Sequence, residues 1–437
     1  MKFVSTRDSS NRVNFEKAVL DCMPADGGLY VPQNFADLRR YLLYVDAKTS
    51  FANIAGTLTS ACINDEFSPI ICETIATKAF TFEPKLKRLN DRLFALELFH
   101  TPTGSHKDFG ISYLVNCLET ILTMKGEKAV FLDATVGELG ASLARAIRGK
   151  KNLKAVLIYP RGFVRGLSDE DFIWNGGNVL PIEVDGTEHD CHRIVREFFA
   201  DRSIVEKYKL TVANTANIGR LLPQMFFYPY AFSRLKEQVS GDIFYAMPCG
   251  NYSNLVAGLY SWRLSLPVNG FICPSTDEIK TDLAGNCQIM DSMVPLKERE
   301  SADPASPSNL ERLEEIFSSY SLMLKHFVYP ANVTDAQSEE ASRKLFLDYN
   351  LYADKNSSEA YAAAVERKEM TDEDEASTVL VMRDHPALSL SWIRHAIGEA
   401  PELPERIQAA LTRTHLENPL VKTSSEVLAL MEKFITL

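Results

Sequence analysis

The spacing of apolar residues changes near residue 93 of this chain. Residues 1–92 combine helical periods with one turn-rich patch, PADGGLYVP at 24–32, and predict a mostly helical N-terminal unit. Beyond residue 92, short apolar runs alternate with helical stretches, which is typical of parallel sheets covered by helices on both faces. The strand-like runs are LFALELF (93–99), KAVFLD (128–133), KAVLIY (154–159), NVLPIEV (178–184), DIFYAMP (242–248), NGFICP (269–274) and STVLVM (377–382). The predicted fold class is therefore α/β.

Two stretches depart from this rhythm. Residues 275–305 are polar and poorly periodic, which indicates a long active-site loop or a mobile segment. The motif HDCH at 189–192 suggests a metal site, but it lacks a second ligand cluster, so we interpret it as a polar helix start and expect no metal. The length of 437 residues indicates two or three folding units.

Composition and charge narrow the possible partners. A net charge of −11 without a basic stripe argues against a nucleic-acid surface, because phosphate binding needs clustered Lys and Arg. The N-terminal residues lack the apolar core of a signal peptide, and no apolar run reaches about 18 residues, so we expect neither export nor a membrane span. Eight cysteines without a C-x-x-C pair indicate reduced, buried thiols and a cytoplasmic location.

Lys107 is the first candidate for chemistry, within ELFHTPTGSHKDFG at 97–110. The apolar run before it reads as a buried strand, and FGISYLVNCLETIL at 109–122 has helical spacing, so Lys107 lies at a strand-to-helix junction. The amides at a helix start carry partial positive charge and disfavour an ammonium, so we expect a lowered pKa and a nucleophilic amine. The alternative is an ordinary solvated lysine in a surface loop.

Two further turns follow predicted strands, where open parallel sheets bind their ligands. ATVGELG at 134–140 and PCGNYSNLVAG at 248–258 each lead from a strand into a helix. The second offers several backbone amides and short polar side chains at a helix start, which suits a phosphate. Each turn alone is also consistent with a simple connection.

The order of three motifs, HTPTGSHKDF (100–109), NTANIGRLLPQ (214–224) and PCGNYSN (248–254), resembles the threonine synthase family of pyridoxal-phosphate enzymes. Similar segments extend the resemblance over nearly the whole chain, namely STRD (5–8), ADGGLYVP (25–32), YPRG (159–162), SPSNLERL (306–313) and HPA (385–387). The resemblance implies a fold type II architecture like that of the tryptophan synthase β-subunit. It also implies an N-terminal domain at 1–92 and a catalytic core at 93–437, with a smaller α/β subdomain at about 125–205.

The resemblance implies that Lys107 binds pyridoxal 5'-phosphate as a Schiff base and later shuttles protons. The family's loop for the cofactor phosphate corresponds to Gly250, Asn251, Tyr252, Ser253 and Asn254. Ser253 stands where the family usually has a second glycine. Its hydroxyl can still donate to phosphate, provided that the backbone there does not need a positive φ.

The resemblance also places the substrate. Asn214, Asn217 and Arg220 match the family's Asn-x-x-Asn-x-x-Arg segment, and Arg220 would bind the phosphate of O-phosphohomoserine through forked, charge-assisted hydrogen bonds. Thr135 and the amides from Gly137 to Gly140 would bind the substrate carboxylate at a helix start. The alternative for Arg220 is an ion pair on a helix surface.

Three departures from the family lie near this chemistry. The carboxylate loop reads Ala-Thr-Ser-Gly-Asp-Thr-Gly in the family, whereas Val136, Glu138 and Leu139 stand here, with the loss of two hydroxyls. Each lost hydrogen bond would cost about 1 kcal/mol or more. Arg383 replaces a threonine that faces the pyridine nitrogen, and an arginine would hold that nitrogen unprotonated and weaken the electron sink. ADKNSSEAYAAA at 353–364 replaces an Asp-Pro-His-x-Ala segment.

The implied activity is conversion of O-phosphohomoserine and water to threonine and phosphate by β,γ-elimination and replacement, in a cytoplasmic monomer or homodimer. The departures leave two alternatives open. One is a divergent pyridoxal-phosphate lyase that acts on another amino acid. The other is a non-catalytic paralogue that binds the cofactor or a metabolite.

Overall fold

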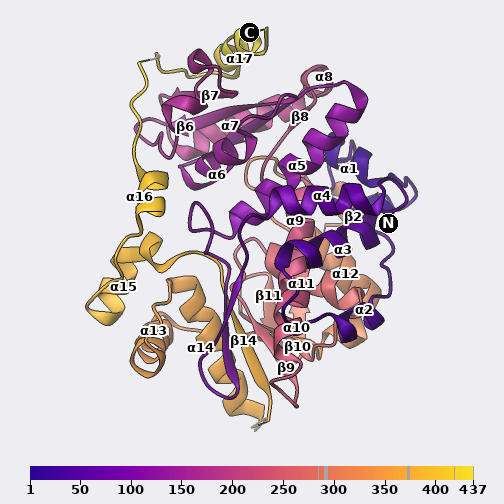
Figure 1. Ribbon diagram of the computed structural model, residues 1–437, viewed down its shortest axis with the longest axis vertical. Coiled ribbons are helices and arrows are strands. Elements are labelled where there is room, and N and C mark those ends of the chain that lie inside the picture. The colour runs from indigo at the N-terminus through magenta and orange to yellow at the C-terminus, as the bar shows by residue number, and fades with distance from the viewer. Residues whose placement is uncertain (284, 290–293, 372–374, 418, 437) are drawn as a thin grey trace.

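Figure 1 shows the computed structural model, which describes residues 1–283, 285–289, 294–371, 375–417 and 419–436. The chain forms two lobes, with a smaller sheet in the upper lobe of this view and a larger sheet in the lower one. Helices cover both sheets. This arrangement confirms the predicted α/β fold class with two helix-covered parallel sheets.

The larger sheet has the strand order β13-β10-β9-β14-β4-β3, and its neighbouring strands are parallel except for β3 and β4. β14, the last of these strands in the sequence, lies between β4 and β9, with Leu380 opposite both Ala95 and Ala246. The carboxyl ends of these three strands therefore meet at one edge. The strands are β3 (Lys85–Arg88), β4 (Leu93–Glu97), β9 (Ile243–Ala246), β10 (Gly270–Pro274), β13 (Val328–Ala331) and β14 (Ser377–Met382).

The smaller sheet is parallel throughout, with the order β7-β6-β5-β8. Its strands are β5 (Ala129–Ala134), β6 (Leu153–Pro160), β7 (Val179–Val184) and β8 (Leu210–Thr211). Two short antiparallel pairs lie outside the main sheets, β1 (Phe3–Ser5) with β2 (Tyr30–Pro32) and β11 (Ile279–Thr281) with β12 (Cys287–Ile289).

The helices that surround the sheets vary from one turn to five. They are α1 (Phe15–Asp21), α2 (Arg39–Tyr44), α3 (Phe51–Ile63), α4 (Pro69–Ala79), α5 (Lys107–Lys125), α6 (Glu138–Ile147), α7 (Glu188–Ala200), α8 (Arg202–Tyr208), α9 (Ile218–Leu221), α10 (Phe227–Leu235), α11 (Ser253–Arg263), α12 (Leu310–Leu324), α13 (Asp335–Tyr349), α14 (Lys355–Thr371), α15 (Leu390–Ile397), α16 (Glu405–Leu411) and α17 (Ser424–Thr436). In Figure 1 the C-terminal segment runs from α15 past α16 to α17, and so connects the lower lobe with the upper one.

Alternate side chains of the strands pack on opposite faces of each sheet. In the smaller sheet, Phe131 and Leu157 share a core with α5 and α6, whereas Leu132 and Ile158 pack with α7 and α17. Because both faces are buried, the strands read as continuous apolar runs in the sequence.

The N-terminal helices α1 to α4 confirm the predicted helical unit, but they share the main core. Phe51 of α3 contacts Phe109 of α5 and Phe227 of α10, with ring centroids 5.2 and 5.9 Å apart. The aromatic contacts join α3, α5 and α10 into one packed layer. The boundary at residue 92 and the subdomain at about 125–205 stay predictions.

The two irregular stretches have different outcomes. HDCH lies in the first turns of α7, where Thr187 and Asp190 form a capping box, which confirms the predicted helix start. The predicted loop at 275–305 contains the β11 and β12 pair, and its residues 284 and 290–293 lie outside the described residues.

The cysteines agree with the expectation from composition. All eight thiols are buried and free, as predicted. Among the helices that the structure describes, none has the length and apolar character to span a bilayer.

Candidate active site

The loop from β4 to α5 holds Lys107 at the first position of its helix, as the sequence predicts. Residues at the end of β14 fix this loop. Ser105 Oγ donates to Asp384 Oδ1 over 2.5 Å, and the His106 amide donates to the Arg383 carbonyl over 2.8 Å. The central strand of the larger sheet therefore positions the lysine.

The amine of Lys107 forms an ion pair with Glu138, with 2.5 Å between Nζ and Oε2. Glu138 is the first residue of α6, which follows β5 of the smaller sheet, whereas Lys107 follows β4 of the larger sheet. The ion pair therefore connects the two lobes. Burial alone would lower the pKa of Lys107, but the carboxylates of Glu138 and Asp384 outweigh it and raise that pKa above its ordinary value. The expectation of a lowered pKa at the helix start is therefore wrong for this state, because neighbouring charges dominate over the helix amides.

His106 and Asp384 form a second polar pair next to Lys107, with 3.4 Å between His106 Nδ1 and Asp384 Oδ1. Burial lowers the pKa of His106 to about 4, so its ring is neutral at neutral pH. Burial alone would raise the pKa of Asp384, yet the hydrogen bond from His106 and the charges of Lys107 and Arg383 hold it below its usual range. Asp384 is thus an ionised carboxylate in the site.

The turn after β9 has the geometry of an anion-binding loop. Gly250 and Tyr252 have positive φ values of 52° and 65°, and α11 begins at Ser253. Ser253 itself has no positive φ, so the condition for a serine at this position is met. The Tyr252 hydroxyl donates to Glu278 Oε2 over 2.6 Å, which fixes the turn. The Ser253 amide donates to Asn251 Oδ1 over 3.3 Å, so the next amides of the first turn of α11 are the ones that suit a phosphate.

Arg383 directly follows β14, and its side chain lies beside this turn. Nη1 donates to Asn254 Oδ1 over 3.4 Å, and a Cβ on Gly250 would lie 2.7 Å from Nη1. Its Nε is buried and has no hydrogen-bond partner among the described residues. The side chain of Arg383 therefore points to the site and not to the far face of the sheet. That its guanidinium faces the pyridine nitrogen stays a prediction.

Arg220 is buried in α9, with 4% of its surface exposed. Its guanidinium lies over Gly110, one turn after Lys107, where a Cβ would lie 2.8 Å from Cζ. Within the described part of the chain, its Nε and Nη1 have no hydrogen-bond partner. Burial lowers its pKa to about 10 against the opposing charges of Asp108, Asp384 and Asp133. The alternative interpretation of Arg220, as an ion-pair partner on a helix surface, is therefore wrong. A buried guanidinium with two nitrogens that lack hydrogen-bond partners suits the binding of an anion.

The ATVGELG loop carries β5 into α6. Thr135 Oγ1 accepts hydrogen bonds from the amides of Gly137 and Gly140, over 3.0 and 3.2 Å. Gly137 has a φ of 138°, which favours glycine. Thr135 therefore shapes the turn, while its role and that of Gly137 in binding a carboxylate stay predictions.

The asparagines predicted to bind ligands have partners within the fold. Asn214 donates to the Pro304 carbonyl over 2.7 Å, and Asn217 caps α9 and donates to the Val19 carbonyl over 2.9 Å. Asn251 donates to Thr215 Oγ1 over 3.1 Å, and Asn254 donates to Gln224 Oε1 over 2.9 Å. These bonds hold the loops around the site, so a contact of these amides with ligand stays a prediction.

Comparisons with known proteins agree with this arrangement. Residues 2–80 match the family model of the threonine synthase N terminus, and residues 73–384 match that of pyridoxal-phosphate dependent enzymes. A threonine synthase of Buchnera aphidicola subsp. Acyrthosiphon pisum is 30% identical over 413 residues, which cover 93% of this chain and 94% of the relative. This chain belongs to the threonine synthase family.

Solved structures of threonine synthases have the same fold. The crystal structure from Escherichia coli has a TM-score of 0.78 and 27% identity, and the match covers 99% of this chain and 100% of that one. The structure of pyridoxal-phosphate-bound threonine synthase from Brucella melitensis has a TM-score of 0.82 at 22% identity over 99% of both chains. The fold type II architecture is thereby confirmed.

Pyridoxal phosphate is the cofactor of this family, and the residues present fit it. Lys107 offers an amine at the edge of the larger sheet, and the turn at Gly250 offers amides at the start of α11. The buried, unpaired Nε of Arg383 lies beside that turn. A threonine synthase site of this kind therefore has groups for both an aldehyde and a phosphate.

Sequence reasoning missed two site residues, His106 and Asp384, and the pairing of Glu138 with Lys107. Asp384 could have been found, because it lies just after a predicted strand, where ligands of parallel sheets bind. The pairing of Glu138 depends on how the two lobes meet, which no local pattern reveals.

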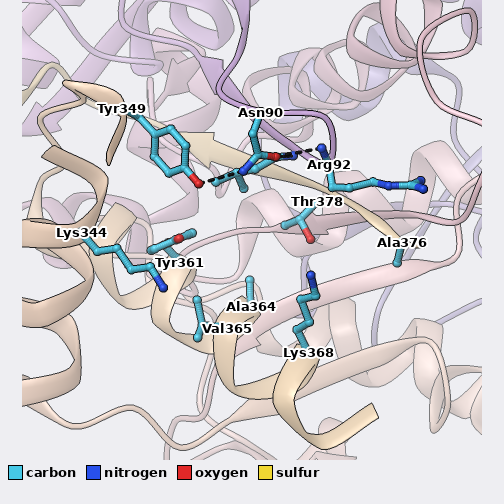
Figure 2. A pocket seen from close by; sticks show the side chains of 11 residues that line it. Asn90, Arg92, Lys344, Tyr349, Tyr361, Ala364, Val365, Lys368, Ala376 and Thr378 are labelled. Carbon is cyan, nitrogen blue, oxygen red and sulfur yellow. Dashed lines mark hydrogen bonds between the residues drawn. The ribbon is translucent and has the colours of Figure 1, made fainter. Parts of the chain in front are cut away.

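A separate cavity of about 440 Å³, shown in Figure 2, lies at the opposite edge of the larger sheet. It is lined by Leu93 and Thr378 at the starts of β4 and β14, and by side chains of α13 and α14 such as Tyr349 and Tyr361. None of the predicted site residues lines it, so this cavity is not the active site.

Proposed function

We propose that this protein is a threonine synthase that converts O-phospho-L-homoserine and water to L-threonine and phosphate. The observation that carries this proposal is the 30% identity to a threonine synthase over 93% of the chain. The products require a carbon–oxygen lyase step at Cγ and the addition of water at Cβ. The reaction therefore needs separate places for two phosphates and one carboxylate.

The site residues divide these tasks. The amides at the start of α11 would bind the cofactor phosphate, and the buried guanidinium of Arg220 would bind the substrate phosphate. The start of α6 would bind the carboxylate. When bound, pyridoxal phosphate supplies a ring that withdraws electrons from the substrate carbons.

Lys107 would move the protons. Its Nζ lies between the two lobes, 2.5 Å from Glu138, so it can reach a substrate amino acid held at the start of α6. Asp384 holds the loop of Lys107 in place through Ser105. A rigid loop keeps the amine in reach of the reacting carbons.

We further propose that the enzyme works in the cytoplasm, as a monomer or a homodimer. The eight buried, free thiols suit a reducing compartment. The net charge of −11 favours a small-molecule substrate over nucleic acid.

The test is phosphate release from O-phospho-L-homoserine by the purified, cofactor-loaded protein, with threonine measured by amino-acid analysis. O-phospho-L-serine, which is one methylene shorter, is the control substrate. We expect equal amounts of phosphate and threonine from the first substrate and no threonine from the second. Release of phosphate without threonine, or no release, would refute the proposal.

A further inference from the structure

Arg165 lies across the carboxylate loop. It follows β6, and its side chain packs on Gly137, where a Cβ would lie 2.6 Å from Cγ and would overlap Nε. Gly137 also has a φ of 138°. The close approach and the positive φ both favour glycine at this position, so the loop is built to accommodate the stem of Arg165.

The polar groups around this contact lack partners. Nε of Arg165 is buried and has no hydrogen-bond partner in the described parts of the chain. The Tyr159 hydroxyl is also unpaired, in a side chain with 0% exposure, and points at Gly140 in the first turn of α6. The amides of Glu138 and Leu139, at the first positions of this helix, have no intrahelical acceptor. Unpaired donors from two elements therefore converge on the start of α6.

This place lies beside the reactive amine. Glu138 is the first residue of α6, and its carboxylate is 2.5 Å from Lys107 Nζ. In an amino acid, the carboxylate carbon is bonded to the carbon that carries the amino group. A substrate whose amino group is held near Lys107 therefore has its carboxylate within reach of the start of α6.

We infer that Arg165 binds the carboxylate of the amino-acid substrate, together with the first amides of α6. This inference rests on the proposed function. The guanidinium offers the paired donors that a carboxylate prefers, and it replaces the hydroxyls that Val136 and Leu139 do not supply. It also offsets the negative charge of Glu138, which would otherwise repel the substrate carboxylate. Arg165 is thus a specificity-determining residue for α-amino acids.

The test compares two phosphonates that differ only in the carboxylate and cannot release phosphate, L-2-amino-5-phosphonopentanoate and 4-aminobutylphosphonate. Their dissociation constants are measured by calorimetry on the cofactor-loaded protein and on Arg165→Gln. We expect the substitution to weaken binding of the amino acid by at least about tenfold and to leave the amine within about twofold. Arg161→Gln is the matched control, because Arg161 lies in the same segment but is exposed and pairs with Asp185.

Equal loss of both ligands, or no loss of either, would overturn the role of Arg165. Arg165→Lys keeps the positive charge but not the two parallel N–H donors of the guanidinium. The same dissociation constants are measured on this variant if Arg165→Gln does not fold. Arg165→Lys should lose affinity for the amino acid alone. If the unaltered protein releases no phosphate, the proposed function fails, and L-homoserine with 3-amino-1-propanol then tests the carboxylate site independently.

Discussion

The two sheets contribute differently to the site around Lys107. The larger sheet supplies the loop of Lys107 and the turn at Gly250, which follow the family pattern except at Ser253. The smaller sheet supplies the start of α6, where Val136, Glu138 and Leu139 depart from it. Cofactor binding depends on backbone geometry that few residues can adopt, whereas a carboxylate can be bound by any set of well-placed donors. The comparison therefore separates a cofactor side that keeps the lysine and the turn, with Ser253 and Arg383 as changes, from a substrate side whose carboxylate loop is altered at three of its seven positions.

Lys107→Ala should have the largest effect, because it removes the nucleophile that the larger sheet supplies. We expect complete loss of covalent cofactor attachment, measured by mass spectrometry after borohydride reduction, and loss of activity. Lys125→Ala, at the other end of α5, is the control, since Lys125 pairs with Glu16 on the surface. Attachment of the cofactor in Lys107→Ala would contradict the site.

Arg220→Met tests the proposal that Arg220 binds the phosphate of the substrate. We expect binding of O-phosphohomoserine to weaken by about 2 kcal/mol, roughly thirtyfold, because the phosphate would lose a desolvated charge partner. Thermal stability should fall only modestly, because methionine fills the buried site although Asp108, Asp384 and Asp133 lose a nearby opposite charge. Unchanged kinetics with a lower melting temperature would show that Arg220 is structural.

Arg383→Thr would sharpen the comparison, because Arg383 is the main departure on the larger-sheet side. We expect the rate of β,γ-elimination to rise by about tenfold, since one pKa unit on the ring nitrogen corresponds to 1.36 kcal/mol. Cofactor attachment at Lys107, followed by visible absorbance, should be unchanged. Arg383→Lys keeps a positive charge and should not raise the rate, so an equal rise in both variants would disprove the argument.

Glu138→Gln should have the smallest effect. It should change the pH dependence of cofactor capture, by which we mean the rate at which Lys107 of the cofactor-free protein binds added pyridoxal phosphate covalently. Capture needs the neutral amine, and Glu138 with Asp384 raises the pKa of Lys107, so capture becomes faster as pH rises towards that pKa. Loss of the Glu138 charge lowers the pKa, and we expect capture about threefold faster at neutral pH.

The midpoint of the rate profile in Glu138→Gln should accordingly move to lower pH. Glu16→Gln breaks a surface ion pair with Lys125 and serves as the control. An unchanged midpoint in Glu138→Gln would show that Asp384 alone sets the pKa.

The predicted strands were those with both faces buried. β4, β5, β6, β7, β9, β10 and β14 all coincide with apolar runs. β3 was not predicted, because three of its four residues are Lys or Arg and the strand is mostly exposed at the sheet edge. β8 has two residues, too few for a local pattern. β13 lies in the short apolar run FVYPA at 327–331, which was not interpreted as a strand.

The site was predictable where it depends on short motifs. Lys107 and the Gly250 turn could be located because each follows a strand. The burial of Arg220 and the pairing of Glu138 with Lys107 could not, since both arise where α6 and α9 approach α5 from other parts of the chain. The sign of the Lys107 pKa shift was wrong for the same reason.

The position of β14 also affects how the protein folds during and after its synthesis. Leu93 pairs with Thr378 in the finished sheet, and Ile243 pairs with Ser377, so the sheet closes through contacts of high sequence separation. During translation, β4 and β9 emerge long before the strand that joins them, and each presents an open edge. A nascent chain that ends before residue 377 lacks the centre of its sheet, with Arg383 and Asp384. We therefore expect slow folding after release from the ribosome and a dependence on chaperones during that delay.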